Sequence, residues 1–228
     1  MKDLLVIVPT RGRPGNVSRQ QLALMETRTK LADVLYAVDD DDPKAMEYAR
    51  LDGVSIAVGP RLRLAGTLNF LSSVHASGYR YIGFMGDDHM PRTPFWDQVL
   101  VASMDARPGP VVAYGDDLFQ GANLPTAVFM PSRLITAMGY MCPPGMQHLW
   151  LDNAWMSVGL ELGTLAYLPE VVVEHMHPFA GKGEIDAGYR EVNAAAVNDA
   201  DRAAFEAWRS NPEGLTAAVS RIRTEYGL

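Results

Sequence analysis

The sequence of 228 residues contains a single cysteine, Cys142, which cannot form an intramolecular disulfide and has no partner for a thiolate metal site. We therefore expect a reducing setting, that of the cytoplasm. No apolar run approaches the roughly 20 residues of a membrane span, and the first, residues 4–8, is also too short for the core of a signal peptide. The uncharged stretch 134–151 contains glycines and prolines that would interrupt a spanning helix. The sequence predicts no membrane insertion.

Positive charge is also in short supply. Lys and Arg number 20 and Asp and Glu number 27, so the formal net charge is 20 − 27 = −7. This balance disfavours a broadly basic nucleic-acid binder, although a local basic patch stays possible. The chain has no G-x-x-x-x-G-K-[ST] loop, no G-x-G-x-x-G after its first strand-like run and no G-x-S-x-G turn. P-loop, dinucleotide-binding and serine-hydrolase functions thereby lose their main support.

What the chain does have is ample material for one core, with 48% hydrophobic and 21% charged residues. Four strand-like runs alternate with helix-like segments that we expect to begin at Pro14, at Asp42-Pro43 and at Thr93-Pro94. The runs span residues 4–8, 34–38, 54–58 and 79–85. Shorter strands follow at 111–114, 126–130 and 167–175, with a helix at about 149–159 and two terminal helices broken at Asn211-Pro212. The pattern predicts a single α/β domain: a mostly parallel sheet with helices on both faces and a small C-terminal helical extension.

Parallel sheets of this kind bind ligands at the carboxyl ends of their strands. In this chain the predicted strand ends carry positive and acidic side chains. Asp39 lies where a base or ribose would be hydrogen-bonded, Asp42 is explained as a helix cap, and the other two acids of the run 39–42 are expected to be solvated. The positive set suggests anion recognition, because guanidinium groups bind phosphate bidentately; it comprises Arg11, Arg13, Arg61, Arg63 and Lys182. The alternatives are salt bridges to the acidic run and, for Lys182, an idle surface loop.

The strongest motif is the acidic turn after the fourth strand, with Asp87, Asp88 and His89. Hard divalent cations prefer oxygen ligands and bridge readily to phosphates, so this turn is a candidate site for Mn²⁺ or Mg²⁺. A solvated or helix-capping turn is the alternative. His175 and His177 come late in the chain, at the end of a predicted strand, and we expect at most one of them to face the acidic cluster unless the chain turns there. Structural hydrogen bonding is the alternative for both.

Asp152 lies between two tryptophans, Trp150 and Trp155, in an apolar stretch. Burial would raise the pKa of its carboxyl and make it a candidate general base, while Trp150 could stack on a sugar. The alternative for Asp152 is a helix N-cap. The two remaining histidines, His75 and His148, we interpret as ordinary helix or core-edge residues.

Together these positions resemble the glycosyltransferases of the GT-A fold, particularly family 2, over residues 4–180. In that family a V-P-[TS]-x-x-R-like turn lies under the nucleotide, which Pro9, Thr10, Arg11 and Arg13 match. Asp39 matches the acid that contacts the base. The segment 62–70 resembles a shortened G-x-x-x-A-x-x-x-N motif that ends in Asn69, and residues 86–89 loosely match the metal-binding D-x-D, with Gly86 in the place of its first aspartate. Asp88 is therefore the favoured metal ligand.

The resemblance implies a metal-dependent transfer of a hexosyl or related sugar from a nucleoside diphosphate sugar to an acceptor hydroxyl, on a saccharide, a protein or a hydroxylated DNA base. Asp152 would be the base of an inverting enzyme, and His89, His175 or His177 could add metal ligands. The nucleotide-sugar half would span about 1–110, the acceptor half about 111–190 and the terminal helices about 191–228. The alternatives are a sugar-phosphate nucleotidyltransferase and a non-catalytic nucleotide- or carbohydrate-binding module.

Overall fold

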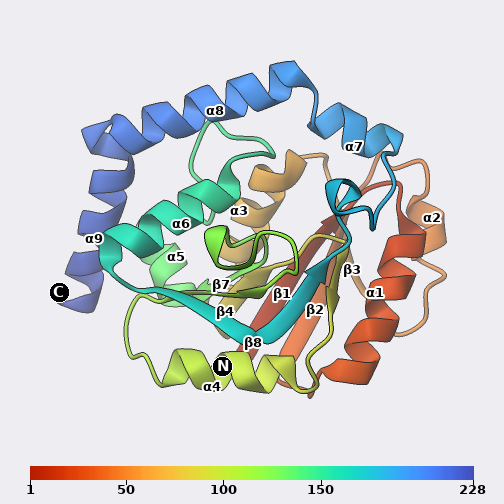
Figure 1. The fold of residues 1–228 in the computed structure, drawn as a ribbon, viewed down its shortest axis with the longest axis horizontal. Coiled ribbons are helices and arrows are strands. Elements are labelled where there is room, and N and C mark those ends of the chain that lie inside the picture. Colours follow the sequence, from red (N-terminus) through yellow and green to blue (C-terminus); the bar gives the residue numbers. More distant parts are fainter.

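The computed structural model describes residues 1–228 and is built on a curled, eight-stranded sheet with the order β3-β2-β1-β4-β7-β6-β8-β5 (Figure 1). Its strands are β1 (Lys2–Thr10), β2 (Ala32–Asp39), β3 (Ser55–Gly59), β4 (Tyr79–Phe84), β5 (His89–Pro91), β6 (Val112–Asp116), β7 (Val128–Pro131) and β8 (Leu165–His175). The first four sequence-predicted strands form the parallel half, in which β1 pairs with β2 and β4, and β2 with β3. β7 runs antiparallel to β4 and to β6, and β8 is parallel to β6.

Helices cover both faces of this sheet. They are α1 (Pro14–Thr27), α2 (Ala45–Tyr48), α3 (Arg63–His75), α4 (Trp96–Asp105), α5 (Ser132–Met138), α6 (Leu151–Leu162), α7 (Ala187–Val192), α8 (Ala195–Ser210) and α9 (Ala217–Tyr226). Side chains alternate along β1, so Leu5 and Ile7 pack with α3, α5, α6, α8 and α9, while Leu4, Val6 and Val8 pack with α1, α2 and α4. The predicted fold class, an α/β sheet covered on both faces with a helical C-terminal extension, is confirmed.

Local predictions fail at two helix starts, and one strand is missed. Asp42 does not cap α2, which begins at Ala45 after Lys44; its carboxylate accepts the N–H groups of Gly12 and Lys44 instead. Thr93 does not cap α4: its hydroxyl donates to the carbonyl of Glu170 and accepts from the N–H of Val172, so it joins β8 instead. Phe95, in the left-handed region at φ 60°, precedes the helix. The sequence pattern also gave no sign of β5, whose three residues pair with the end of β8 and are too few to produce a periodicity.

The terminal helices are fastened to the loop before α6. In Figure 1, α8 runs across the molecule beside α6, and α9 descends beside α5 and α6. Asp201 of α8 is 1% exposed, and its carboxylate accepts the backbone N–H groups of Gln147, His148 and Leu149 at 2.8, 2.9 and 2.8 Å. A buried charge is stable only when it is hydrogen-bonded, so this contact fixes the course of the loop. None of the helices is both long enough and apolar enough to cross a membrane.

Candidate functional site

The turn after β1 is held by a chain of buried hydrogen bonds. The backbone N–H of Arg13 donates to the hydroxyl of Tyr48 at 2.7 Å, and Thr10 donates to Asp87 at 2.6 Å. Because the Thr10 proton is used on Asp87, the Tyr48 hydroxyl donates to Thr10, 3.2 Å away. Asp42 completes the arrangement by accepting the N–H of Gly12, which has a left-handed φ of 70°. The turn between β1 and α1 is therefore preorganised.

Asp87, the first acid after β4, faces this turn. Besides Thr10, its carboxylate accepts from Asn16 at 3.3 Å and lies 3.4 Å from the guanidinium of Arg13. Only 5% of Asp87 is exposed, and burial, followed by the neighbouring charge of Asp88, raises the pKa of its carboxyl to about 6. Asp87 therefore ties the end of β4 to the β1 turn and presents little of its surface to a ligand.

Asp88, the second acid, joins two histidines. Its carboxylate oxygens lie 3.6 Å from Nε2 of His175 and 3.4 Å from Nδ1 of His89. Pairing of β5 with β8 sets His89 opposite His175, and residues directly opposite in an antiparallel pair share a face of the sheet. One ligand atom from each of the three residues lies within 4.8 Å of the others, which makes them the metal-ligand candidates of the structure.

The two imidazoles are not equivalent as ligands. Their rings stack at 4.2 Å with an interplanar angle of 21°, and an imidazole nitrogen binds a metal ion in the plane of its ring. Two stacked rings cannot both aim a lone pair at one ion. Nδ1 of His89 already accepts the N–H of Gly86 at 3.0 Å, and its Nε2 is enclosed without a partner. The pair of ligands that fits a divalent cation is thus the carboxylate of Asp88 and Nε2 of His175. The ring of His89 stacks on that of His175 and helps to position it.

This geometry accounts for the departure of the turn from D-x-D. A Cβ atom at Gly86 would lie 2.6 Å from an oxygen of Asp88 and 2.8 Å from Nδ1 of His89. Real Cβ atoms do not approach other atoms so closely, so an aspartate at this position would displace both side chains.

Asp117 is a site residue that the sequence analysis missed. Its carboxylate accepts the backbone N–H groups of residues 119–121 and the hydroxyl of Thr126. Burial acts to raise the pKa of this carboxyl, but the imidazole of His175, followed by these donors, outweighs burial and holds the pKa well below the usual range. It lies 3.8 Å from Nδ1 of His175. Burial disfavours the charged imidazole, but Asp117 and Asp88 outweigh it and raise the pKa of His175 to about 9. A bound cation would displace this proton.

The arginines predicted to bind an anion are all paired with carboxylates. Arg11 bonds to Asp39 at 3.0 Å and also to Asp41, as the salt-bridge alternative expected. Arg61 lies 3.7 Å from Asp39. The other partners come from the far end of the sequence. Arg13 forms a two-bond pair with Asp186 at 2.7 and 2.8 Å, and Arg61 and Arg63 share one oxygen of Glu191 at 2.7 and 2.6 Å.

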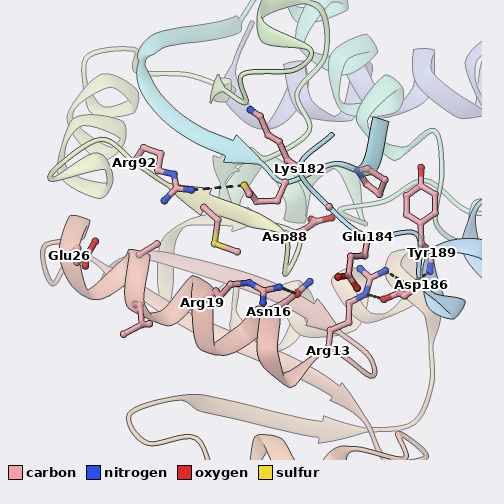
Figure 2. Close-up of a pocket in the computed structure, with 16 residues that line it drawn as sticks. Arg13, Asn16, Arg19, Glu26, Asp88, Arg92, Lys182, Glu184, Asp186 and Tyr189 are labelled. Atoms are coloured by element: carbon pink, nitrogen blue, oxygen red, sulfur yellow. Dashed lines mark hydrogen bonds and ion pairs between the residues drawn. The ribbon is translucent and has the colours of Figure 1, made fainter. Parts of the chain in front are cut away.

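A cavity of about 530 Å³ opens beside Asp88, between α1, β5 and the loop that leads into α7 (Figure 2). Charged side chains of both signs line it, including Arg13, Arg19, Glu184 and Asp186. Lys182 also lines this cavity, and its ammonium group pairs with Glu174 at 2.8 Å. The cavity therefore brings the turn after β1, the metal-ligand candidate Asp88 and the loop before α7 to one place.

The predicted general base, Asp152, lies in the first turn of α6, not at its N-cap. Burial raises the pKa of its carboxyl, and the charge of His175 acts on it in the opposite direction. His148, which we interpreted as an ordinary residue, also has a shifted pKa: burial lowers the pKa of its imidazole to about 4, and the charges of Asp201, Arg13 and Asp88 act on it as well. No sequence pattern marks His148, because its loop is held by residues far away in the chain: Asp201 accepts its N–H group, and the N–H group of Ala65 donates to the carbonyl of Gln147.

Two predicted ligand-binding residues have structural partners. Asn69 accepts the N–H groups of Met141 and Cys142 and donates to the carbonyl of Cys142, so its amide fixes that loop. Trp150 stacks on Phe205 at 5.5 Å and donates its indole N–H to Asn198. Both contacts orient the segment before α6.

His177 does not join the metal-ligand candidates. Its Nδ1 accepts the N–H of Phe179, and its ring stacks on Phe119 at 4.9 Å. Phe179 and Tyr189 also contact this ring. Phe179 is 76% exposed and Phe119 is 38% exposed. These four rings form an aromatic rim next to His175, and the expectation that at most one late histidine faces the acidic cluster fits this arrangement.

Comparison with known proteins adds to this geometry. No family model and no curated protein sequence matches the chain. Among solved structures, the glucosyl-3-phosphoglycerate synthase of Mycobacterium tuberculosis in complex with Mn²⁺, UDP and phosphoglyceric acid is similar at a TM-score of 0.63 and 13% identity, over 92% of this chain and 80% of that one. The mannosyltransferase PcManGT of Pyrobaculum calidifontis, in complex with GDP-Man and Mn²⁺, is similar at a TM-score of 0.55 and 10% identity, over 98% of this chain and 75% of that one. TarS of S. aureus is similar at 0.56 and 13%, over 95% of this chain and 45% of that one.

The architecture is thus that of the GT-A glycosyltransferases, and the resemblance stated from the sequence is confirmed at the level of the fold. At identities of 10–13%, the likeness extends to the fold alone. What the chain binds has to be argued from its own residues.

Proposed function

We propose that the chain is a metal-dependent glycosyltransferase that moves a sugar from a nucleoside diphosphate sugar to an acceptor hydroxyl. The observation that carries the proposal is the Asp88–His175 pair, which lies where β4 ends, at the edge of the sheet where folds of this kind bind ligands. The arginines of the β1 and β3 ends lie along the same edge. Several neighbours of the same fold are described as complexes with Mn²⁺ and UDP or GDP-Man.

Asp88 and His175 would hold the cation, with His89 and Asp117 positioning them. A ligand set with an imidazole nitrogen suits Mn²⁺ better than Mg²⁺, which prefers oxygen. When bound, the cation neutralises charge that develops on the leaving diphosphate. Asp39 and the turn 9–13 would bind the nucleoside, and Arg61, Arg63 and Lys182 would bind phosphate oxygens.

In an inverting reaction, Asp152 would accept the proton of the acceptor hydroxyl, for which its raised pKa suits it. His148 is a second group for this role, because its lowered pKa keeps the imidazole neutral at pH 7. The exposed aromatic rim beside His175 favours a saccharide among the acceptors considered, since aromatic rings stack on the apolar faces of sugars. A protein side chain or a hydroxylated DNA base would use the same hydroxyl chemistry.

Thermal unfolding with UDP, GDP, ADP and their hexose derivatives, each with and without Mn²⁺, tests the donor site. A ligand at about 100 times its Kd adds about 2.7 kcal/mol to native stability, or about 5–10 °C in a domain of this size. We expect a metal-dependent shift for one nucleotide that is lost in Asp88→Asn and kept in Asp33→Asn, whose carboxylate pairs with Lys2 at the opposite edge of the sheet. No shift in folded protein would refute the proposal, and pyrophosphate release from a nucleoside triphosphate would indicate a nucleotidyltransferase.

A further inference from the structure

The segment 186–191, which we name the strap, reaches the proposed donor site through two carboxylates. Asp186 caps α7 by accepting the N–H of Tyr189, and its carboxylate also accepts two hydrogen bonds from the guanidinium group of Arg13. Glu191, at the other end of the strap, accepts from Arg61 and Arg63 on a single oxygen. Figure 2 shows Arg13 turned toward Asp186 in the cavity that Asp88 also lines.

The guanidinium groups of these arginines have a geometry suited to binding an anion. Guanidinium groups offer phosphate the same two-bond geometry that Arg13 gives to Asp186. Arg63 has a left-handed φ of 61°, a conformation that costs free energy for any residue except glycine and that often marks functional sites. This backbone conformation accompanies the convergence of Arg63 and Arg61 on one acceptor oxygen.

Apart from the contacts of Tyr189 with the rings of His177 and Phe179, the strap has few other contacts with the rest of the protein. No residue from 174 to 200 is buried, and α7 has no buried side chain. Asp186 and Glu191 are themselves 39% and 45% exposed. The ion pairs of the strap lie partly in solvent, where such pairs add only modest net stability. Segments without buried apolar contacts are those that open most readily in native proteins. The strap can therefore leave the arginines without disturbing either half of the core.

From this geometry we infer that the strap is an internal competitor of the donor: Asp186 and Glu191 occupy the guanidinium groups that the phosphates of a nucleoside diphosphate would take, and donor binding displaces them together. The inference rests on the proposed function for the identity of the ligand. Its consequence is regulatory, because apparent donor affinity is reduced by the fraction of molecules in which the strap is closed.

The test compares two double variants of equal net charge. Asp186→Asn with Glu191→Gln removes the competing carboxylates, whereas the control, Glu206→Gln with Asp199→Asn, removes two exposed charges of α8 that make no ion pair with these arginines. Calorimetric titration with UDP and GDP in the presence of Mn²⁺ should show about three- to tenfold tighter binding in the strap variant, the range expected from the release of two partly exposed carboxylates. The control should bind as the unaltered protein does.

Equal or weaker binding by the strap variant would overturn the inference, since the strap would then assist the donor. Equal tightening in the control would overturn it too, because general charge would be the cause. Absence of nucleotide binding in all three proteins would instead remove the proposed function, and the inference with it.

A second measurement needs no ligand. Trypsin can cleave after Lys182 and Arg190, which flank or lie in the strap. The strap variant without nucleotide should be cut there several-fold faster than the control, and nucleoside diphosphate should accelerate the cut in the unaltered protein. Unchanged cleavage of the strap variant, or protection by the nucleotide, would contradict release of the strap.

Discussion

Replacing Asp201 by alanine should destabilise the protein more than any change of a surface charge. The carboxylate is 1% exposed and accepts three backbone N–H groups at 2.8–2.9 Å. Hydrogen bonds to a charged group contribute about 1.5–3 kcal/mol each, and their removal leaves three buried donors without partners. Because contributions within one cluster do not add in full, we expect a loss of about 3–5 kcal/mol in the free energy of unfolding, at the extreme of single substitutions.

Urea unfolding followed by circular dichroism measures this loss from the midpoint, provided the slope is unchanged. Asp199→Ala is the matched control on the same helix: its carboxylate is 64% exposed and pairs only with Arg202, so its effect should stay within about 0.5 kcal/mol. Asp201→Asn, which keeps one acceptor oxygen, should fall between the two. A loss below about 1 kcal/mol for Asp201→Ala would refute the reasoning, because the three N–H groups would then have found other partners.

Three further predictions concern pH, packing and reactivity. The pKa of His148 is about 4 in the folded protein against 6.5 in the unfolded protein, so the stability it contributes is present above pH 6.5 and is lost as the pH falls toward 4. Between pH 7 and pH 4.5, the free energy of unfolding measured in urea should fall by about 2 kcal/mol more in the unaltered protein than in His148→Gln. An equal fall in both proteins would contradict this. Gly115→Ala should lower the free energy of unfolding by about 2–3 kcal/mol, because its Cβ would lie 2.1 Å from the carbonyl oxygen of Val171. Gly109→Ala, with open space around it, should leave the thermal unfolding midpoint unchanged. Similar midpoints for the two variants would contradict this packing argument. The buried thiol of Cys142, whose pKa is raised by burial, should react with a thiol reagent only after denaturation, so rapid native labelling would disprove its enclosure.

The parallel half of the sheet was predictable because its strands are continuous apolar runs, as burial on both faces requires. The runs 4–8 and 34–38 lie inside β1 and β2, and the first helix begins at Pro14 as expected. Thr93 shows the limit of a local rule. A threonine before proline is a good helix start by composition, but here the hydroxyl had a nearer partner in β8, a strand that begins more than 70 residues later.

The residues of the candidate site also fall into those that the sequence predicts and those that it does not. The strand ends that carry Arg11, Asp39 and Asp88 could be foreseen, since the carboxyl ends of parallel strands meet at one edge of the sheet. The partners that decide the roles of these residues could not: Asp186 meets Arg13 across 173 positions, and Asp117 reaches His175 through a loop with no motif. His148 was interpreted as an ordinary residue because no local pattern shows that Asp201, 53 positions later in the chain, holds its loop.

Because the arginines of the candidate site are already paired with carboxylates, an acidic chain of this kind would need a cation to bind an anionic donor. Each of Arg11, Arg13, Arg61 and Arg63 is matched by a carboxylate, so this edge of the sheet has little free positive charge to attract a diphosphate. On the proposed function, a donor must exchange with the strap carboxylates, and exchange of one anion for another returns little electrostatic free energy. A divalent ion between Asp88 and His175 would displace the proton of His175 and still add one net positive charge to this edge. The dependence on metal and the competition by the strap would then have the same cause, the small net positive charge at this edge of the sheet. Weakening the strap should therefore also lower the Mn²⁺ concentration needed for nucleotide binding.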